Sequence, residues 1–144
     1  MLAVALVALT GCGSAKHVAA RQIPQRPSLR TTAGRDSVAR FGCPAHPGTT
    51  IDFEACAVRD RLKLNTRFDA AVTALWPMLD APGKREFARG QRSWNRFVKD
   101  ECDVAYREYL GGTEAPVEAG WCYVSLTRAR VKEVSGMLAL YSQG

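Results

Sequence analysis

Residues 90–102, with the sequence GQRSWNRFVKDEC, constrain the fold more than any other stretch of the chain. Their apolar side chains recur at steps of about three, four and seven residues, which is the period of one face of an α-helix. The stretch contributes Trp94, Phe97, Val98 and Cys102 to this face. Phe87, three residues before the stretch, lies on the same face. Because the face combines aromatic area with a cysteine, we expect it to be buried and cross-linked.

Three helices are predicted from such periodicity, at residues 51–79, 84–109 and 117–141. No segment alternates apolar and polar residues as a half-buried strand would. The predicted fold class is therefore all-α, an antiparallel bundle of three helices cross-linked by two disulfides. Its domain is expected to span residues 41–144.

The predicted ends of these helices carry local signals. Thr50 is a suitable N-cap for the first helix, and Pro77 should kink or end its last turn. Pro82 can serve as the first residue of the second helix, because a proline has no N–H to leave unpaired there. Gly111 and Gly112 are typical residues for ending that helix.

Five cysteines indicate the compartment and one modification. They are Cys12, Cys43, Cys56, Cys102 and Cys122. Without a C-x-x-C motif, and with only two histidines in the chain, they do not resemble a zinc site. We predict no metal and no cofactor. The odd count leaves one cysteine with a separate role.

Cys12 is the candidate for that role. Residues 1–11 are an uncharged apolar run, too short for a transmembrane helix, which needs about 20 residues. The run ends in Leu9-Thr10-Gly11-Cys12, which has the form of a bacterial lipobox, so we expect a lipoprotein signal peptide at residues 1–11 and lipidation of Cys12. The alternatives are an ordinary secretory signal and a chance Leu-Thr-Gly-Cys sequence in an apolar leader. The expected location is the bacterial cell envelope, at the outer membrane or at the outer leaflet of the plasma membrane.

Residues 12–40 read as a basic, flexible tether that follows the lipidated cysteine. They contain six Lys and Arg residues and one acid, which accounts for +5 of the net charge of +6. The remaining residues are therefore nearly neutral, which argues against a nucleic-acid-binding domain. The tether could bind an anionic membrane surface. Solvated arginines without a partner remain an equal alternative.

No catalytic constellation is visible in the sequence. His17 lies in the tether and His46 in a Pro-Gly turn, and neither has a nucleophile or an acid at a recognisable spacing. Asp100 and Glu101 are adjacent, so they point to different faces of a helix, which suits solvation better than glycosidase chemistry. We therefore expect a protein that is not an enzyme.

A set of motifs resembles the LprI-type lysozyme-inhibitor family, over about residues 42–140. The resemblance implies a small, exported, four-cysteine helical domain that binds lysozyme. The matching residues are Cys43, Cys56, Leu64, Asn65, Phe68, Gln91, Arg92, Trp94, Cys102, Gly111, Gly112, Thr113, Pro116, Cys122, Leu126, Thr127, Ala129 and Arg130. Physically, most of them are expected to pack the core, cover the helix surface or reverse the chain.

The chain departs from that family pattern at charged positions. Arg61 stands where relatives usually have an Asp, and Val98-Lys99 stands where they have Arg-Asp. The resemblance implies that the lost Asp and Arg pair across the first two helices in relatives. The fold should tolerate this change, whereas a binding surface made from those charges should not.

Four cysteines allow three disulfide connectivities. If the first two helices form a hairpin, Cys56 and Cys102 lie at comparable depths near its open end. These depths, together with the paired charges that the resemblance implies just inside them, favour Cys56 with Cys102 and Cys43 with Cys122. The main alternative is Cys43 with Cys102 and Cys56 with Cys122.

Two classes of function remain. The first is a lipid-anchored protein that binds and inhibits lysozyme or another peptidoglycan hydrolase. The second is an envelope interaction or stability module without affinity for lysozyme. A basic lysozyme is best met by an acidic surface, and a nearly neutral domain by itself favours neither class.

Overall fold

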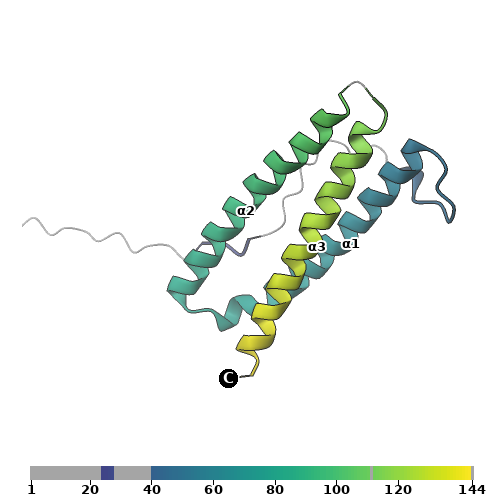
Figure 1. The fold of residues 1–144 in the computed structure, drawn as a ribbon. Helices are drawn as coiled ribbons and strands as arrows, with labels where there is room; N and C mark the ends of the chain where they lie inside the picture. The colour runs from purple at the N-terminus through teal and green to yellow at the C-terminus, as the bar shows by residue number, and fades with distance from the viewer. Residues whose placement is uncertain (1–23, 28–39, 111, 144) are drawn as a thin grey trace, which may run out of the picture.

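The computed structural model describes residues 24–27, 40–110 and 112–143, and three long helices account for most of them. The helices are α1 (Thr50–Leu75), α2 (Ala81–Glu108) and α3 (Ala115–Tyr141), and a 3-10 helix, η2 (Trp76–Met78), follows α1 (Figure 1). These described residues contain no strand. The predicted all-α bundle of three helices is therefore confirmed. Cys12 and Gly111 lie outside the described residues.

The first residues of α1 form a capping box, and the N-cap is Thr49, one residue before the predicted Thr50. The Thr49 hydroxyl accepts a hydrogen bond from the Asp52 N–H at 3.2 Å. In return, the Asp52 carboxylate accepts from the N–H groups of Thr49 at 3.0 Å and Gly48 at 3.1 Å. These bonds, above all the one from the Gly48 N–H, lower the pKa of Asp52. The helix start is thus held by local side-chain chemistry.

The connection from α1 to α2 follows the predicted proline signal. Pro77 lies in η2, where the α-helix tightens before the chain reverses. Asp80 then caps α2 by accepting from the Gly83 N–H at 2.8 Å, with Pro82 in the first turn. Helices α2 and α3 begin three and two residues before the predicted residues 84 and 117.

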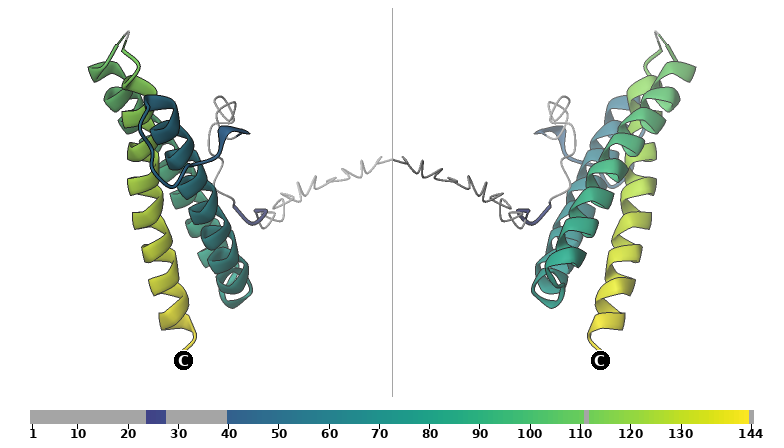
Figure 2. Two further views of the ribbon diagram at one scale, coloured as in Figure 1. Left: turned by 90° about the vertical axis from the view of Figure 1, so that its right-hand side faces the viewer. Right: turned by 90° about the vertical axis from the view of Figure 1, so that its left-hand side faces the viewer.

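Helix α3 is the centre of the arrangement. It packs along both α1 and α2, whereas in the described chain α1 and α2 have at most marginal contact with each other. Figures 1 and 2 show α3 running beside each of the other two helices. Helices α1 and α2 therefore do not pack closely along each other as a hairpin. Each of them packs on α3 instead.

The core follows from this arrangement. Toward the α1–α2 turn, Phe68, Leu75 and Val134 belong to one buried cluster, against which Trp94 and Phe87 pack. A smaller cluster of Ala57, Leu64 and Val124 lies nearer the other end.

One residue of the predicted buried face of α2 was assigned wrongly. Val98 and Cys102 are buried as expected, but Phe97 is 51% exposed. Helix α2 packs mainly on α3 and has little backbone contact with α1, so only a narrow stripe of α2 is buried, and Phe97 lies one residue, or about 100°, away from Val98 around the helix.

The disulfides are Cys43–Cys56, with a Cα–Cα distance of 4.4 Å, and Cys102–Cys122, at 5.6 Å. All four cysteines are paired as predicted. The connectivity is the third of the three possible ones, so the favoured pairing and its main alternative are both wrong. The segment before α1 folds back on α1 itself, which brings Cys43 to Cys56. Cys102 faces α3, because α3 separates α2 from α1, and Cys122 on α3 is therefore its partner.

Candidate functional site

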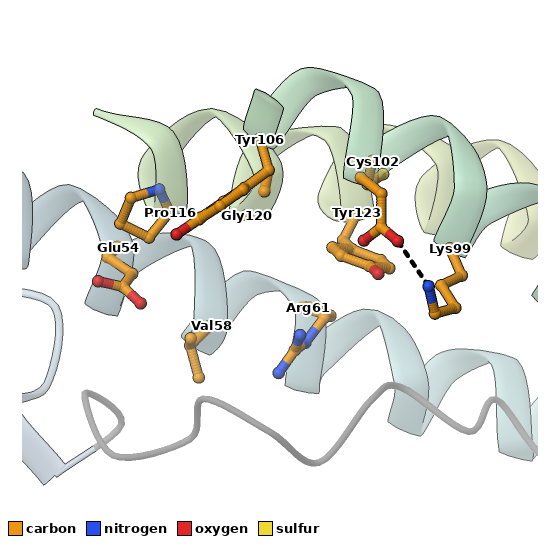
Figure 3. Close-up of a pocket in the computed structure, with 11 residues that line it drawn as sticks. Glu54, Val58, Arg61, Lys99, Cys102, Tyr106, Pro116, Gly120 and Tyr123 are labelled. Carbon is orange, nitrogen blue, oxygen red and sulfur yellow. Dashed lines mark hydrogen bonds and ion pairs between the residues drawn. The ribbon is translucent and has the colours of Figure 1, made fainter. Parts of the chain in front are cut away.

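A pocket of about 250 Å³ opens between the three helices at the end that carries both disulfides (Figure 3). Each helix lines it with residues spaced four and seven positions apart, so that one face of each helix looks into it. Its lining residues are Glu54, Val58 and Arg61 of α1; Lys99, Cys102, Asp103 and Tyr106 of α2; and Pro116, Ala119, Gly120 and Tyr123 of α3.

The pocket is rich in charged and aromatic side chains. Arg61 is only 9% exposed, and its guanidinium carbon lies 6.0 Å from the centroid of the Tyr123 ring. Lys99 forms an ion pair with Asp103 at 2.5 Å, which raises the pKa of Lys99. The Tyr106 ring reaches from α2 toward α1 in Figure 3. Tyr and Arg are the residue types that most often dominate protein–protein interfaces.

Two structural features hold this pocket open and in place. The Cys102–Cys122 disulfide joins α2 to α3 beside it. Gly120 lets α3 approach α1, since a Cβ at that position would lie 3.0 Å from the Ala57 Cβ. The three walls are thus joined by a covalent bond and by a close helix–helix contact.

Two of the charged residues noted in the sequence lie at this pocket. Arg61 and Lys99 both line it, from α1 and α2 respectively. Val98, in contrast, is buried and is not among the lining residues. Lys99, and not Val98, therefore lines the pocket together with Arg61.

Charge is strongly segregated along the bundle. We define the disulfide end as residues 43–62, 99–110 and 112–126, and the turn end as residues 63–98 and 127–143. The disulfide end holds nine acids and four bases, whereas the turn end holds ten bases and four acids. A domain that is nearly neutral as a whole therefore has a net charge of −5 at one end and +6 at the other.

The family-motif residues lie mostly outside the pocket. Gln91 is fully buried, where its amide donates to Asn95 Oδ1 at 2.9 Å and its oxygen accepts from Arg130 Nε at 3.0 Å. Arg130 also pairs with Glu133 at 2.9 Å. Gln91 and Arg130 therefore join α2 to α3.

The remaining motif residues have separate places in the fold. Leu64 and Thr127 are buried, Trp94 and Asn65 are half-buried, and Gly112 is exposed in the loop before α3. Among the described motif residues, Cys102 of α2 and Pro116, in the first turn of α3, line the pocket.

Sequence reasoning missed most of the pocket residues. Glu54, Val58 and Arg61 have the same spacing as Lys99, Asp103 and Tyr106, and as Pro116, Gly120 and Tyr123. This spacing indicates that the residues of each set share one face of their helix. The first two sets combine charged residues with apolar or aromatic ones, and the third combines a proline and a glycine with a tyrosine, so none of the three has a recognisable apolar or polar pattern. Only the tertiary structure shows that the three faces meet.

Other kinds of site find no support in the described ranges. Within them, no cluster of His, Cys, Asp and Glu could hold a metal ion. None of the helices that the structure describes is both long and apolar enough to cross a bilayer.

The fold is that of a small helical domain with two disulfides and a pocket between its helices, and two disulfides in a domain of this size are typical of proteins that fold outside the cytoplasm. The family model described as lysozyme inhibitor LprI matches residues 43–134. The chain therefore belongs to the LprI family of lysozyme inhibitors. No curated protein and no solved structure matches the chain significantly.

Proposed function

We propose that this protein binds a lysozyme or a related muramidase through its disulfide end and inhibits it by covering the enzyme's substrate cleft. The observation that carries the proposal is the net charge of −5 at the end that contains the pocket. Membership of the lysozyme-inhibitor family supports the same partner. Lysozymes are typically basic, and an acidic surface attracts and orients a basic partner.

The pocket supplies the specific contacts in this proposal. The excess of acids over the whole disulfide end steers the enzyme, and a side chain of the enzyme enters between Tyr106 and Tyr123. The pocket lining itself is balanced in charge, with Glu54 and Asp103 against Arg61 and Lys99. Aromatic side chains in a desolvated pocket give affinity, whereas charges at the rim chiefly raise the rate of association.

Inhibition in this proposal is stoichiometric rather than catalytic. All four cysteines of the domain are in disulfides, so none of them is a free nucleophile. We expect inhibition to titrate with the enzyme and to survive chelators. Inactivation of many enzyme molecules by one molecule of this protein, or loss of inhibition in EDTA, would contradict this mechanism.

The proposed location is the outside of the cell, at the bacterial envelope. Two disulfides are typical of exported proteins. The sequence Leu9-Thr10-Gly11-Cys12 supports lipidation of Cys12, and the basic residues 12–40 would connect the anchor to the domain.

A turbidity assay with charge-reversal variants tests the proposed surface. We expect Glu101→Lys with Glu108→Lys, at the disulfide end, to weaken inhibition at least about ten-fold, mainly through slower association. Asp69→Lys with Glu86→Lys changes the net charge equally at the turn end, and it should change inhibition by less than about three-fold.

Two outcomes would contradict the proposal. Equal loss in both variants would mean that net charge matters and not the disulfide end. Absence of binding by the unaltered chain would leave the alternative, an envelope interaction module without affinity for lysozyme. Raising the ionic strength should slow association with the unaltered chain, because salt screens the attraction between exposed charges.

A further inference from the structure

Helix α2 carries a continuous stripe of positive charge on one flank. The stripe consists of Arg85, Arg89, Arg92, Arg96 and Lys99, at successive steps of four, three, four and three residues. Such steps keep all five on one side of a helix. At about 1.5 Å per residue, the stripe is roughly 21 Å long. It runs from the turn end to Lys99, which lines the pocket, and all but Arg85 are exposed.

The stripe is electrostatically unfavourable for the isolated helix. Neighbouring cations at these spacings repel one another, and basic residues near a helix N-terminus oppose the helix dipole. Glu86 pairs with Arg89 and Asp103 pairs with Lys99. Within the described chain, no acid forms an ion pair with Arg85, Arg92 or Arg96. Helix stability therefore does not explain the stripe, whereas an anionic partner would.

Exposed apolar side chains lie at the same end of the bundle. Met78 in η2 is 46% exposed, and Leu140 and Tyr141 at the end of α3 are 72% and 52% exposed. Figure 1 shows η2, the start of α2 and the end of α3 together at this end. A soluble polyanion would use only the charges. Basic residues beside exposed apolar and aromatic ones are the composition of surfaces that lie in the headgroup region of an anionic bilayer.

We propose that the turn end of the bundle docks on an anionic phospholipid membrane through the α2 stripe and through Met78, Leu140 and Tyr141. Because one flank and one end dock together, the bundle is tilted on the membrane, with the disulfide end farther from it than the turn end. The interaction uses the folded domain and is independent of lipidation at Cys12. It leaves most of the pocket free for lysozyme, because Lys99 is the residue that the stripe shares with the pocket lining.

Co-sedimentation of the full chain with lipid vesicles tests the stripe. Every variant carries Cys12→Ser, so that no acyl chain contributes. The vesicles contain about one-third phosphatidylglycerol in phosphatidylcholine, and pure phosphatidylcholine is the reference. We expect Arg85→Gln with Arg92→Gln and Arg96→Gln to weaken binding to the anionic vesicles at least about ten-fold. The corresponding Arg→Lys variant should retain most of the binding.

A matched control removes three exposed cations from the other two helices. Lys63→Gln with Arg67→Gln and Lys132→Gln has the same net charge as the stripe variant, and it should weaken binding by no more than about two-fold to three-fold. Equal loss in both variants would overturn the proposal, because it would show attraction by net charge alone. Unchanged binding by the stripe variant would also overturn it. Far-UV circular dichroism checks that each variant is folded.

The apolar part has a separate test. Met78→Ser with Leu140→Ser and Tyr141→Ser should abolish the binding that remains at about 0.5 M salt, where charge attraction is largely screened. If these changes have no effect, and soluble polyphosphate competes fully with the vesicles, the partner is a polyanion and the membrane proposal is wrong. Tight binding to pure phosphatidylcholine would contradict the role of the stripe.

Discussion

At the scale of single residues, the hydrogen bonds of Gln91 are the structure's clearest addition to the sequence pattern. A fully buried amide costs free energy unless its donors and acceptor are satisfied. The Gln91 nitrogen donates to Asn95 in its own helix, and the Gln91 oxygen accepts from Arg130 in α3, so each of the two amide atoms has a partner. Arg130 in turn lies 5.7 Å from the centroid of the Phe87 ring. The amide therefore sets how α2 is oriented on α3, which apolar packing alone would leave less specific.

A double-mutant cycle on this pair gives the first prediction of stability. Gln91→Leu removes the acceptor of the Arg130 Nε–H, and we expect it to cost about 1–3 kcal/mol of the free energy of unfolding. Arg130→Leu removes the other partner, and the double variant should be less destabilised than the sum by at least about 0.5 kcal/mol. Urea unfolding measures all three. Arg128→Leu, at an exposed position in the same helix, should stay within about 0.5 kcal/mol of the unaltered chain. Strict additivity for Gln91 and Arg130 would contradict the coupling.

At the scale of elements, the contact between α1 and α3 depends on a small residue. Gly120 faces Ala57, and a Cβ built at Gly120 would lie 3.0 Å from the Ala57 Cβ. Gly136, in the same helix, has no atom within 4 Å of its built Cβ. Glycine within a helix costs about 1 kcal/mol relative to alanine. At Gly120 that cost is offset by the close approach of two helices, whereas at Gly136 it is not.

Substitutions at these two glycines should therefore have opposite effects. We expect Gly136→Ala to raise the free energy of unfolding by about 0.5–1 kcal/mol, since it gains helix propensity without a clash. Gly120→Val should lower it by about 1–3 kcal/mol, because α1 and α3 must move apart. Gly136→Val is the control for the propensity of valine. If Gly120→Val and Gly136→Val prove equally stable in thermal unfolding, the helices are not in close contact at Gly120.

At the scale of the whole molecule, the two ends are built differently. The disulfide end holds both covalent cross-links, the pocket and the excess of acids. The turn end holds the larger buried cluster, with Phe68 and Leu75, and the excess of bases. Apolar burial thus stabilises one end, and the disulfides hold the other end, where polar residues line an open pocket.

Removal of each disulfide should affect a different part of the molecule. The bonds join residues 13 and 20 positions apart, so the chain-entropy relation gives about 3 kcal/mol for each. Cys102→Ala with Cys122→Ala should speed amide hydrogen exchange in the last turns of α2, because that helix packs mainly on α3. Cys43→Ala with Cys56→Ala should speed exchange only near the start of α1.

Peptide mapping of the unaltered chain tests the connectivity directly. Without reduction, it should yield one peptide that contains Cys43 linked to Cys56 and another that contains Cys102 linked to Cys122. A peptide linking Cys56 to Cys102 would contradict this connectivity and would support the pairing that the sequence favours. Faster exchange in α2 after loss of Cys43–Cys56 would also contradict the separation of the two parts.

The sequence by itself determined the features that depend on neighbours along the chain. The all-α class, the three helices, the break at Pro77 and the family all follow from local periodicity, capping chemistry and motif spacing. Only the tertiary structure decided the disulfide pairs, the exposure of Phe97 and the pocket. The Cys102–Cys122 pair, the exposure of Phe97 and the pocket depend on how α3 packs against α1 and α2, a choice among packings in which the same apolar stripes can be buried. The Cys43–Cys56 pair depends on the segment before α1 folding back on that helix. The segregation of charge was hidden for the same reason, because acids and bases far apart in sequence are gathered into two ends only when the helices pack antiparallel.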